Sequence, residues 1–441
     1  MTRIVVLLST VLAAVALAGR AQAAVYYVSS QGDDTKAGTS PATAWRTLQK
    51  VNNTQLKPGD SVLLQGGQTF DGPLVPWGSG KQGKPVVFAS YGSGKATIAS
   101  SNNNIVFFHA VSWVTLQNLK LTANGTDDHI VASDPTTTSA YITLQNDLIT
   151  NTAAFGINSP SLTDHDWTIT GNTISETNET GITFRGANFK VIGNVVQDTG
   201  LHPSEGAHGV YAKGPSAQVI GNTITNFNAS GVSIRYQNSQ VIGNAISNGM
   251  IGISYFQDSD VKSGGTSTIA YNKIFNVSLA GMYLDGGTLE SFVIANNTVW
   301  TLGGNAINVR PVKSLTLVNN IFTGTFDDYA GLLTKPTKSF TEGRNLWFPG
   351  SGPVLLWQGA ARTLGQYQAA SHQGSGDLTV DPLLDSSLFP SASSPVIDAG
   401  VTVKGLPYAA TCNGTAFSYC DRAPDIGASE RKKRKRSPVR R

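Results

Sequence analysis

Three cationic side chains recur at one position of a repeated phrase, and their chemistry suits an anionic ligand. Arg185, Lys213 and Arg235 each follow a Gly-apolar-x-apolar phrase, and Lys213 and Arg235 are 22 residues apart. Elimination beside a carboxylate needs a base, a cation that stabilises enolate-like charge, and an acid for the leaving oxygen. A lysine can be that base where neighbouring cations disfavour its ammonium form. The pattern therefore favours Lys213 as a base between two arginines.

Two insertions flank this position and supply further candidates. Residues 199–208 precede the phrase that ends at Lys213, and residues 257–265 follow a later phrase. Long loops on a rigid repeat are frequent places for function, so we expect them to wall a groove. Tyr211 and His208 join Lys213 and Arg235 as catalytic candidates, with His208 as a proton carrier. The substrate-binding candidates are Arg185, His202, Glu205, Tyr236, Phe256, Tyr283 and Asp285.

Other interpretations of these residues remain open. The three cations could pair with local carboxylates, for which Glu176, Glu179 and Glu205 are candidates. Two carboxylates could instead hydrolyse a glycoside, and the candidates are Glu205, Asp258, Asp260 and Asp285. A groove could also bind a glycan without cleaving it, as in a carbohydrate-binding or surface protein. No cofactor is certain, although calcium is possible at Asp258 and Asp260. His202 and His208 do not have an established zinc spacing, so a polar loop is the preferred interpretation.

The element that positions these residues is a repeat. Gly-Asn-x-apolar units begin at Gly171, Gly193, Gly221 and Gly243, with spacings of 22 and 28 residues. A period of roughly 22 residues is typical of solenoids. Asparagines at equivalent turns can stack amide on amide and bond buried backbone groups, so we interpret them as structural. Looser copies occur at Asn118, Asn146, Asn272, Asn297 and Asn320.

The Gly-apolar-x-apolar phrases predict short strands with one buried face. Several such strands per repeat, without a helical period between them, predict an all-β, single-stranded parallel β-helix. The first and third residues after glycine should point inward, including Tyr255. The second and fourth should form outward stripes roughly 4.8 Å apart from coil to coil. The second-position stripe contains Thr183, Tyr211, Ser233, Ser254 and Tyr283, and the fourth-position stripe contains Arg185, Lys213, Arg235, Phe256 and Asp285.

The ends of the chain differ from the repeat. An amphipathic helix that starts at Ser40-Pro41 and includes Trp45, Leu48 and Val51 should cap the first coil. We expect a signal peptide at 1–23, the N-terminal cap and first coils at 24–110, the repeat at 111–345, an irregular C-terminal cap at 346–430 and a basic, disordered tail at 431–441. The signal predicts a secreted or periplasmic protein without a membrane span, in which Cys412 and Cys420 can form a disulfide.

Charge narrows the class of partner. Outside the signal and the tail, acidic residues outnumber basic ones, which disfavours nucleic acid as a partner. Phosphate loops, nucleophile elbows and dinucleotide fingerprints are absent from the sequence. The cationic stripe instead favours an anionic ligand, which we expect to be an acidic polysaccharide, and we expect the protein to be a monomer.

Both ends of the repeat resemble secreted proteins of the pectate-lyase-like superfamily. The similar segments are Tyr26–Ser30, Gly38–Leu48, Asp381–Leu383, Ser394–Gly400 and Asp425–Glu430. This resemblance implies a right-handed parallel β-helix and a carbohydrate-related activity. Lys213 and Arg235 on adjacent coils also look like the base and the acid or carboxylate clamp of β-helix lyases related to alginate lyases and chondroitin B lyase. The resemblance implies a polysaccharide lyase, although no calcium-binding carboxylates of those lyases can be matched.

Overall fold

The computed structural model describes residues 23–100, 104–123, 129–202, 206–349, 353–406 and 423–431. Glu205, the proposed disulfide between Cys412 and Cys420, and nearly all of the expected signal peptide and basic tail lie outside the described residues. Within those ranges no helix is both long and apolar enough to cross a membrane.

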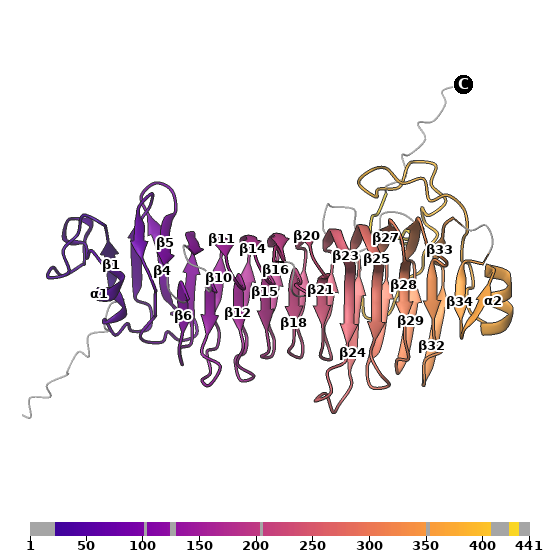
Figure 1. Ribbon diagram of the computed structural model, residues 1–441, viewed down its shortest axis with the longest axis horizontal. Coiled ribbons are helices and arrows are strands. Elements are labelled where there is room, and N and C mark those ends of the chain that lie inside the picture. Colours follow the sequence, from indigo (N-terminus) through magenta and orange to yellow (C-terminus); the bar gives the residue numbers. More distant parts are fainter. Residues whose placement is uncertain are drawn as a thin grey trace, which may run out of the picture.

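The described chain winds into an elongated stack of coils, in which every strand except the last one pairs in parallel with its counterpart one coil away (Figure 1). Three faces run along the stack. The first face contains β1 (Val25–Val28), β2 (Ser61–Gln65), β4 (Val86–Tyr91), β7 (Val114–Gln117), β10 (Thr143–Gln145), β13 (Thr168–Thr170), β16 (Lys190–Ile192), β19 (Gln218–Ile220), β22 (Gln240–Ile242), β24 (Thr266–Ala270), β26 (Ser291–Ala295), β29 (Ser314–Val318) and β32 (Ser339–Gly343).

The other two faces follow the first one in each coil. The second face contains β3 (Thr69–Asp71), β5 (Ala96–Ser100), β8 (Leu119–Ala123), β11 (Leu148–Thr152), β14 (Thr173–Thr177), β17 (Val195–Thr199), β20 (Thr223–Phe227), β27 (Thr298–Thr301), β30 (Ile321–Gly324) and β33 (Leu346–Trp347). The third face contains β6 (Val106–Phe108), β9 (Val131–Ser133), β12 (Ile157–Ser159), β15 (Ile182–Phe184), β18 (Val210–Ala212), β21 (Ser230–Ile234), β28 (Asn305–Val309), β31 (Gly331–Leu333) and β34 (Leu355–Trp357). Two long strands, β23 (Ala245–Phe256) and β25 (Lys273–Asp285), contribute to both of these faces.

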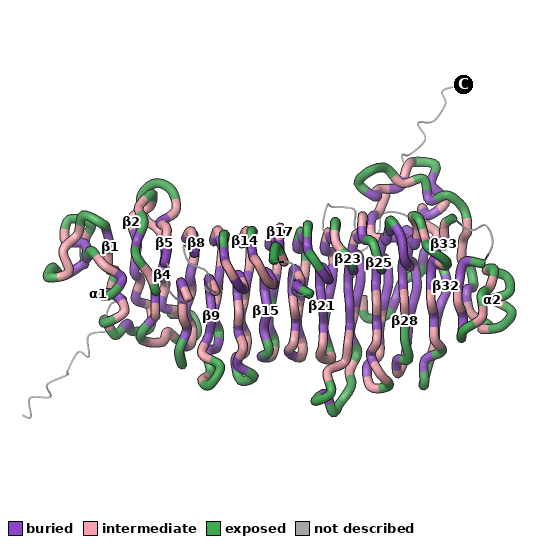
Figure 2. The backbone as a smooth tube through the Cα atoms, viewed as in Figure 1, coloured by how far each residue is buried: buried purple, intermediate pink, exposed green. Residues whose placement is uncertain are grey.

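Alternating side chains explain why these segments form strands around one core. Ile182, Val210, Val232 and Ile253 lie in register on successive coils and are fully buried. Apolar residues of this kind form a continuous column along the inside of the solenoid, whereas the loops at the coil corners are exposed (Figure 2). The predicted all-β parallel β-helix is confirmed, and its rigid third face carries the candidate residues.

The predicted asparagine ladder is confirmed, with a correction to its first members. The backbone nitrogen of Asn222 and its side-chain Nδ2 each donate to Asn244 Oδ1 at 2.9 Å. Nδ2 also donates to the Val191 carbonyl at 2.9 Å. Asn118 and Asn146 are not members of the ladder, whose members we call rungs. They lie one residue before the ladder position, as Gly171 lies before Asn172, and their φ angles of 57° and 54° are close to the 64° of Gly171. Asparagine tolerates this left-handed conformation better than most residues, which explains the substitution for glycine.

The N-terminal cap is more broken than predicted. The segment from Pro41 forms a short 3₁₀ turn, η1 (Pro41–Thr43), and the α-helix α1 (Leu48–Asn52) begins only after a second cap at Thr47. Trp45 lies between them, where it pairs with Val28 of β1, so one continuous helix was the wrong prediction. The apolar residues expected to cover the first coil, Trp45, Leu48 and Val51, are nevertheless buried.

The C-terminal end is irregular, as predicted. The strand β35 (Ala360–Arg362) pairs antiparallel with β34, and the helix α2 (Leu364–Ser371) then covers the last coil. The later segments return along the outside of the stack, where Ile426 and Val396 pack on Ile321 and Leu346.

Candidate functional site

Register along the third face sets the candidate side chains in a column. Ile182, Val210, Val232 and Ile253 are partners on consecutive strands, and Arg185, Lys213, Arg235 and Phe256 each follow three residues later. Tyr255 is fully buried, as expected. The other outward stripe is partly covered: Tyr211 and Tyr283 are half-buried, whereas Thr183, Ser233 and Ser254 are buried. Their short side chains lie between longer neighbours, so the expectation of solvent exposure was wrong for these three.

Lys213 and Arg235 converge on one carboxylate. Lys213 Nζ lies 3.5 Å from Asp258 Oδ2, and Arg235 Nη1 lies 3.6 Å from Asp258 Oδ1. Lys213 and Arg235 are therefore balanced by Asp258 of the second insertion, a carboxylate that was not among the glutamates considered as alternative partners. Both distances exceed those of a well-formed charge-assisted hydrogen bond, so the contact is loose.

The two arginines of the column differ in their surroundings. Arg185 is exposed and forms no ion pair with any described residue. Arg235 is partly buried, and its Nε is a buried donor that has no hydrogen-bond partner within the described ranges. Unsatisfied buried donors are rare in folded proteins, so this Nε of the Arg235 guanidinium is a group that a bound ligand could satisfy.

Aromatic rings hold these cations in place. Lys213 Nζ lies 5.4 Å and Arg235 Cζ lies 5.2 Å from the centre of the Tyr211 ring. Arg235 also lies 5.1 Å from the Phe256 ring, which stacks on Tyr283 at a centroid distance of 5.1 Å. Cation–π contacts of this geometry orient a cation without neutralising it. The structure thus brings together Tyr211, Lys213, Arg235, Phe256 and Tyr283.

His208 contributes from the first insertion. Its ring lies 4.6 Å from the Tyr211 ring, and its Nδ1 accepts a hydrogen bond from the Ser230 backbone nitrogen at 3.2 Å. Burial, with a smaller effect of nearby Arg235, lowers the pKa of His208 from 6.5 to about 4. His208 is therefore neutral at pH 7, and because Nδ1 accepts, the proton is placed on Nε2.

The remaining predicted residues lie at the edge of this cluster. The Tyr236 hydroxyl donates to Asp260 Oδ2 at 2.5 Å, and burial together with Asp260 raises the pKa of Tyr236 to about 12. His202 is exposed on the first insertion, and Asp285 is the register partner of Phe256 on the next coil of the column. Asp258 and Asp260 thus contact cationic and phenolic groups. In the described part of the chain, no group of three or more His, Cys, Asp or Glu residues could hold a metal ion.

A cavity of about 390 Å³ opens beside the cluster and contains residues that the sequence analysis missed. Arg185, Lys213, Tyr211 and His208 line it on one side. The residues that complete it are Phe155, Asn158, Pro160, Glu179, Thr180, Thr183, Gly206 and Ala207. Asn158 belongs to β12, whose phrase Gly156-Ile157-Asn158-Ser159 has a serine at the third position. A looser pattern would have found this strand and extended the predicted groove by one coil.

Comparison with known proteins identifies the fold. Residues 186–341 match the family model described as a right-handed β-helix region. The solved structure of pectate lyase Pel9A is similar, with a TM-score of 0.53, 18% identity and coverage of 94% of this chain and 98% of that chain. The complex of XylC with xylose has a TM-score of 0.59 and 10% identity, over 82% and 87% of the two chains. The chain therefore has a right-handed parallel β-helix fold.

A curated relative is similar over a shorter region. Lacto-N-biosidase from Bifidobacterium longum subsp. longum is 33% identical over 133 residues, which is 23% of this chain and 8% of that enzyme. This chain thus spans only a small part of the length of its curated relative.

Proposed function

We propose that this protein binds an acidic polysaccharide along its third face and cleaves it by β-elimination. The observation that carries the proposal is the convergence of Lys213 and Arg235 on one carboxylate, at 3.5 and 3.6 Å. Asp258 occupies the position that the carboxylate of a uronate residue would take. Because Asp258 is held loosely by a loop, a substrate carboxylate can displace it.

The roles follow from the chemistry of elimination. Arg235 binds the uronate carboxylate and stabilises the negative charge that develops on it. In its neutral amine form, Lys213 takes the proton from the carbon beside that carboxylate and becomes an ammonium group, and the freed electron pair forms a carbon–carbon double bond. The bond from the neighbouring carbon to the glycosidic oxygen then breaks, and the Tyr211 hydroxyl supplies the proton that this oxygen needs. Neutral His208 packs on the Tyr211 ring and positions it.

Product chemistry tests this proposal. Purified protein is incubated with alginate, polygalacturonate and glycosaminoglycans, and the ultraviolet absorbance of the unsaturated product is followed. Lys213→Ala should lose at least about a hundredfold in rate, because a positioned base contributes about that much or more. Lys190→Ala, which removes an exposed lysine from the first face, is the matched control and should retain full activity. Unchanged activity of Lys213→Ala would eliminate it as the base.

Glycoside hydrolysis is a second candidate, favoured by the partial match to lacto-N-biosidase. Asp258 and Asp260 would then be the leading carboxylates, because both lie on the insertion beside the cavity. Hydrolysis yields new reducing ends without ultraviolet absorbance. Reducing ends that disappear in Asp258→Ala but persist in Lys213→Ala would assign the protein to this class. Retention of glycan with neither product would instead identify a binding protein.

A further inference from the structure

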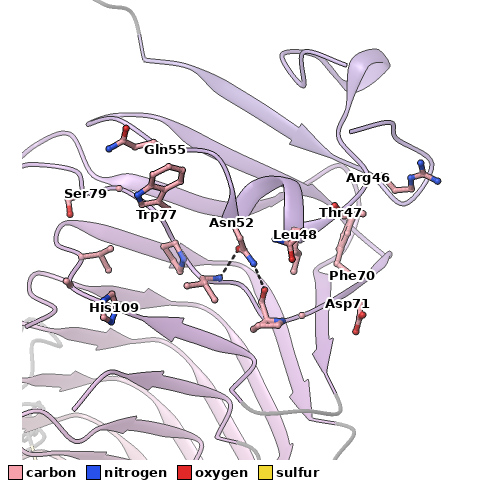
Figure 3. Close-up of a pocket in the computed structure, with 18 of the residues that line it drawn as sticks. Arg46, Thr47, Leu48, Asn52, Gln55, Phe70, Asp71, Trp77, Ser79 and His109 are labelled. Atoms are coloured by element: carbon pink, nitrogen blue, oxygen red, sulfur yellow. Dashed lines mark hydrogen bonds between the residues drawn. The ribbon is translucent and has the colours of Figure 1, made fainter. Parts of the chain in front are cut away.

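A large cavity lies at the N-terminal end of the stack, away from the site proposed above. It has a volume of about 1130 Å³ and is formed between the cap around α1 and the first coils. Figure 3 shows Trp77 and His109 on one side of this cleft, and Arg46 and Asp71 on the other. A cavity of this size is sufficient for a ligand of several rings.

Hydrogen bonds fix the wall of the cleft. Asn52 of α1 donates through Nδ2 to the Pro73 carbonyl at 2.8 Å and accepts from the Val75 backbone nitrogen at 2.9 Å (Figure 3). These two bonds fix the cap against the segment that leads to Trp77. The Trp77 carbonyl also accepts from the Leu56 backbone nitrogen at 2.8 Å. The main chain at Trp77 is therefore anchored, although its side chain is 51% exposed.

Trp77 lies in the same column as the candidate catalytic residues. Leu74 pairs with Val106, and the register continues through Val131, Ile157, Ile182 and Val210. Trp77 follows Leu74 by three residues, as Lys213 follows Val210. Five coil steps separate them, which is roughly 24 Å at the usual strand spacing.

The cleft and the cavity beside Lys213 nearly meet along this face. The cleft is lined by His109, which follows β6, and the cavity is lined by Asn158 of β12. Only the coil of β9 lies between the strands of these two residues. A polymer that runs along the third face can therefore occupy both.

We propose that the cleft is a second binding site for the polysaccharide, in which the ring face of a sugar stacks on Trp77. This inference rests on the proposed function for the identity of the polysaccharide. The stacking of a sugar ring on Trp77 does not depend on that function. The cleft is lined by one arginine and one aspartate, so it has no excess of positive charge. Stacking, supported by hydrogen bonds to exposed polar groups such as Gln49 and Gln55, requires no charge on the sugar. The cleft makes the protein prefer long chains over short ones.

Polymer length separates the two sites. On polygalacturonate, Trp77→Ala should raise KM by about tenfold, because a stacked ring is lost, while kcat is retained. Short oligosaccharides from the same polymer reach only the site at Lys213, so their kcat/KM should not change. Trp77→Phe should recover most of the loss because it keeps a stacking face. Trp300→Ala, which removes a 37% exposed tryptophan from the second face, is the matched control.

Binding without turnover keeps the inference testable if no cleavage occurs. Native gels are cast with polygalacturonate, alginate or the neutral polymer xylan, and retardation is compared at low and high salt. Trp77→Ala should reduce retardation at both salt concentrations, whereas Lys213→Ala should reduce it mainly at low salt. Loss in Trp77→Ala alone supports the cleft and contradicts the proposed site. Equal retardation of Trp77→Ala and the unmodified protein, or no retardation by any of the three polymers, overturns the inference.

Discussion

At the scale of single residues, Asp258 controls the access of a ligand to Lys213 and Arg235, because it forms ion pairs with both. Its carboxylate is only partly buried, and an ion pair of this kind contributes about 1 kcal/mol or less to stability. A ligand carboxylate must displace it before it can contact Lys213 and Arg235. Asp258 therefore competes with the proposed substrate and weakens its binding.

The variant Asp258→Asn tests this competition. We expect the affinity for polygalacturonate to rise by about two- to fivefold at low salt, because the two cations are no longer balanced. The measurement is isothermal titration calorimetry at two salt concentrations. Asp260→Asn is the control, because Asp260 accepts from Tyr236 and forms no ion pair with a described lysine or arginine. A lower affinity in Asp258→Asn would mean that Asp258 itself positions the cations or contacts the sugar.

His208 makes stability depend on pH. Its pKa is about 4 in the folded protein and 6.5 without burial, so between these values only the unfolded state takes up a proton. The free energy of unfolding should thus fall as the pH is lowered from 6.5 to 4, by about 3 kcal/mol from this residue. In His208→Asn the amide oxygen can still accept a hydrogen bond from Ser230, and this variant should lack the pH-dependent contribution of His208 to the free energy of unfolding. Melting temperatures of both proteins from pH 7 to 4.5 check the prediction, and parallel curves would contradict it.

At the scale of elements, the asparagine ladder runs along the turn into the second face, and an aspartate, Asp147, occupies the ladder position before Asn172. Asp147 precedes the rung Asn172, and its backbone nitrogen donates to Asn172 Oδ1 at 2.8 Å. Its Oδ1 accepts from Leu119, while Oδ2 is buried with no partner among the described residues. In the rungs that follow, Nδ2 is the donor to the next rung. Burial raises the pKa of Asp147 to about 7, so the side chain keeps a proton in the folded state where a free aspartate would lose it.

Replacing Asp147 with asparagine should therefore stabilise the protein. Between pH 3.8 and 7 the unfolded state gives up this proton and the folded state does not, so the natural residue costs more stability as the pH rises. We expect Asp147→Asn to gain about 2–4 kcal/mol at pH 8 and much less at pH 4. Urea denaturation of both proteins at these pH values measures the difference. Asn172→Asp, the reverse change one rung further on, should be destabilising at pH 8.

The ladder also shows what could be predicted from the sequence. The phrase Gly-Asn-x-apolar predicted both the coil and the structural role of its asparagine, because backbone conformation and buried hydrogen bonds restrict these positions to few residue types. Asn146 was wrongly assigned to the ladder for the same reason, because asparagine is suitable both for the left-handed position and for the ladder position that follows it. The rung there is Asp147, which no count of asparagines would find.

The candidate site was predicted unevenly for a physical reason. Lys213 and Arg235 are placed by strand register, which follows directly from the 22-residue spacing. Asp258 lies on a loop, whose path depends on side-chain contacts that the repeat does not specify, so its pairing with both cations was missed. The cleft at Trp77 was missed because it is formed between the cap and the first coils, where the repeat is weakest.

At the scale of the whole molecule, each coil contacts only its neighbours, so a defect at one end should remain local. Tyr367 of α2 is fully buried against the last coil, where its hydroxyl donates to Glu342 at 3.0 Å and its ring meets Trp357 edge-on at 5.5 Å. Tyr367→Ala should cost about 3–5 kcal/mol, as the loss of a buried aromatic ring usually does. Hydrogen exchange measured by mass spectrometry should reveal lost protection in β32 and β34, while β16, β19 and β22 remain protected and the Lys213 site keeps its activity. Uniform loss of protection along the stack would instead mean that the solenoid unfolds as one cooperative unit, whose function depends on both caps.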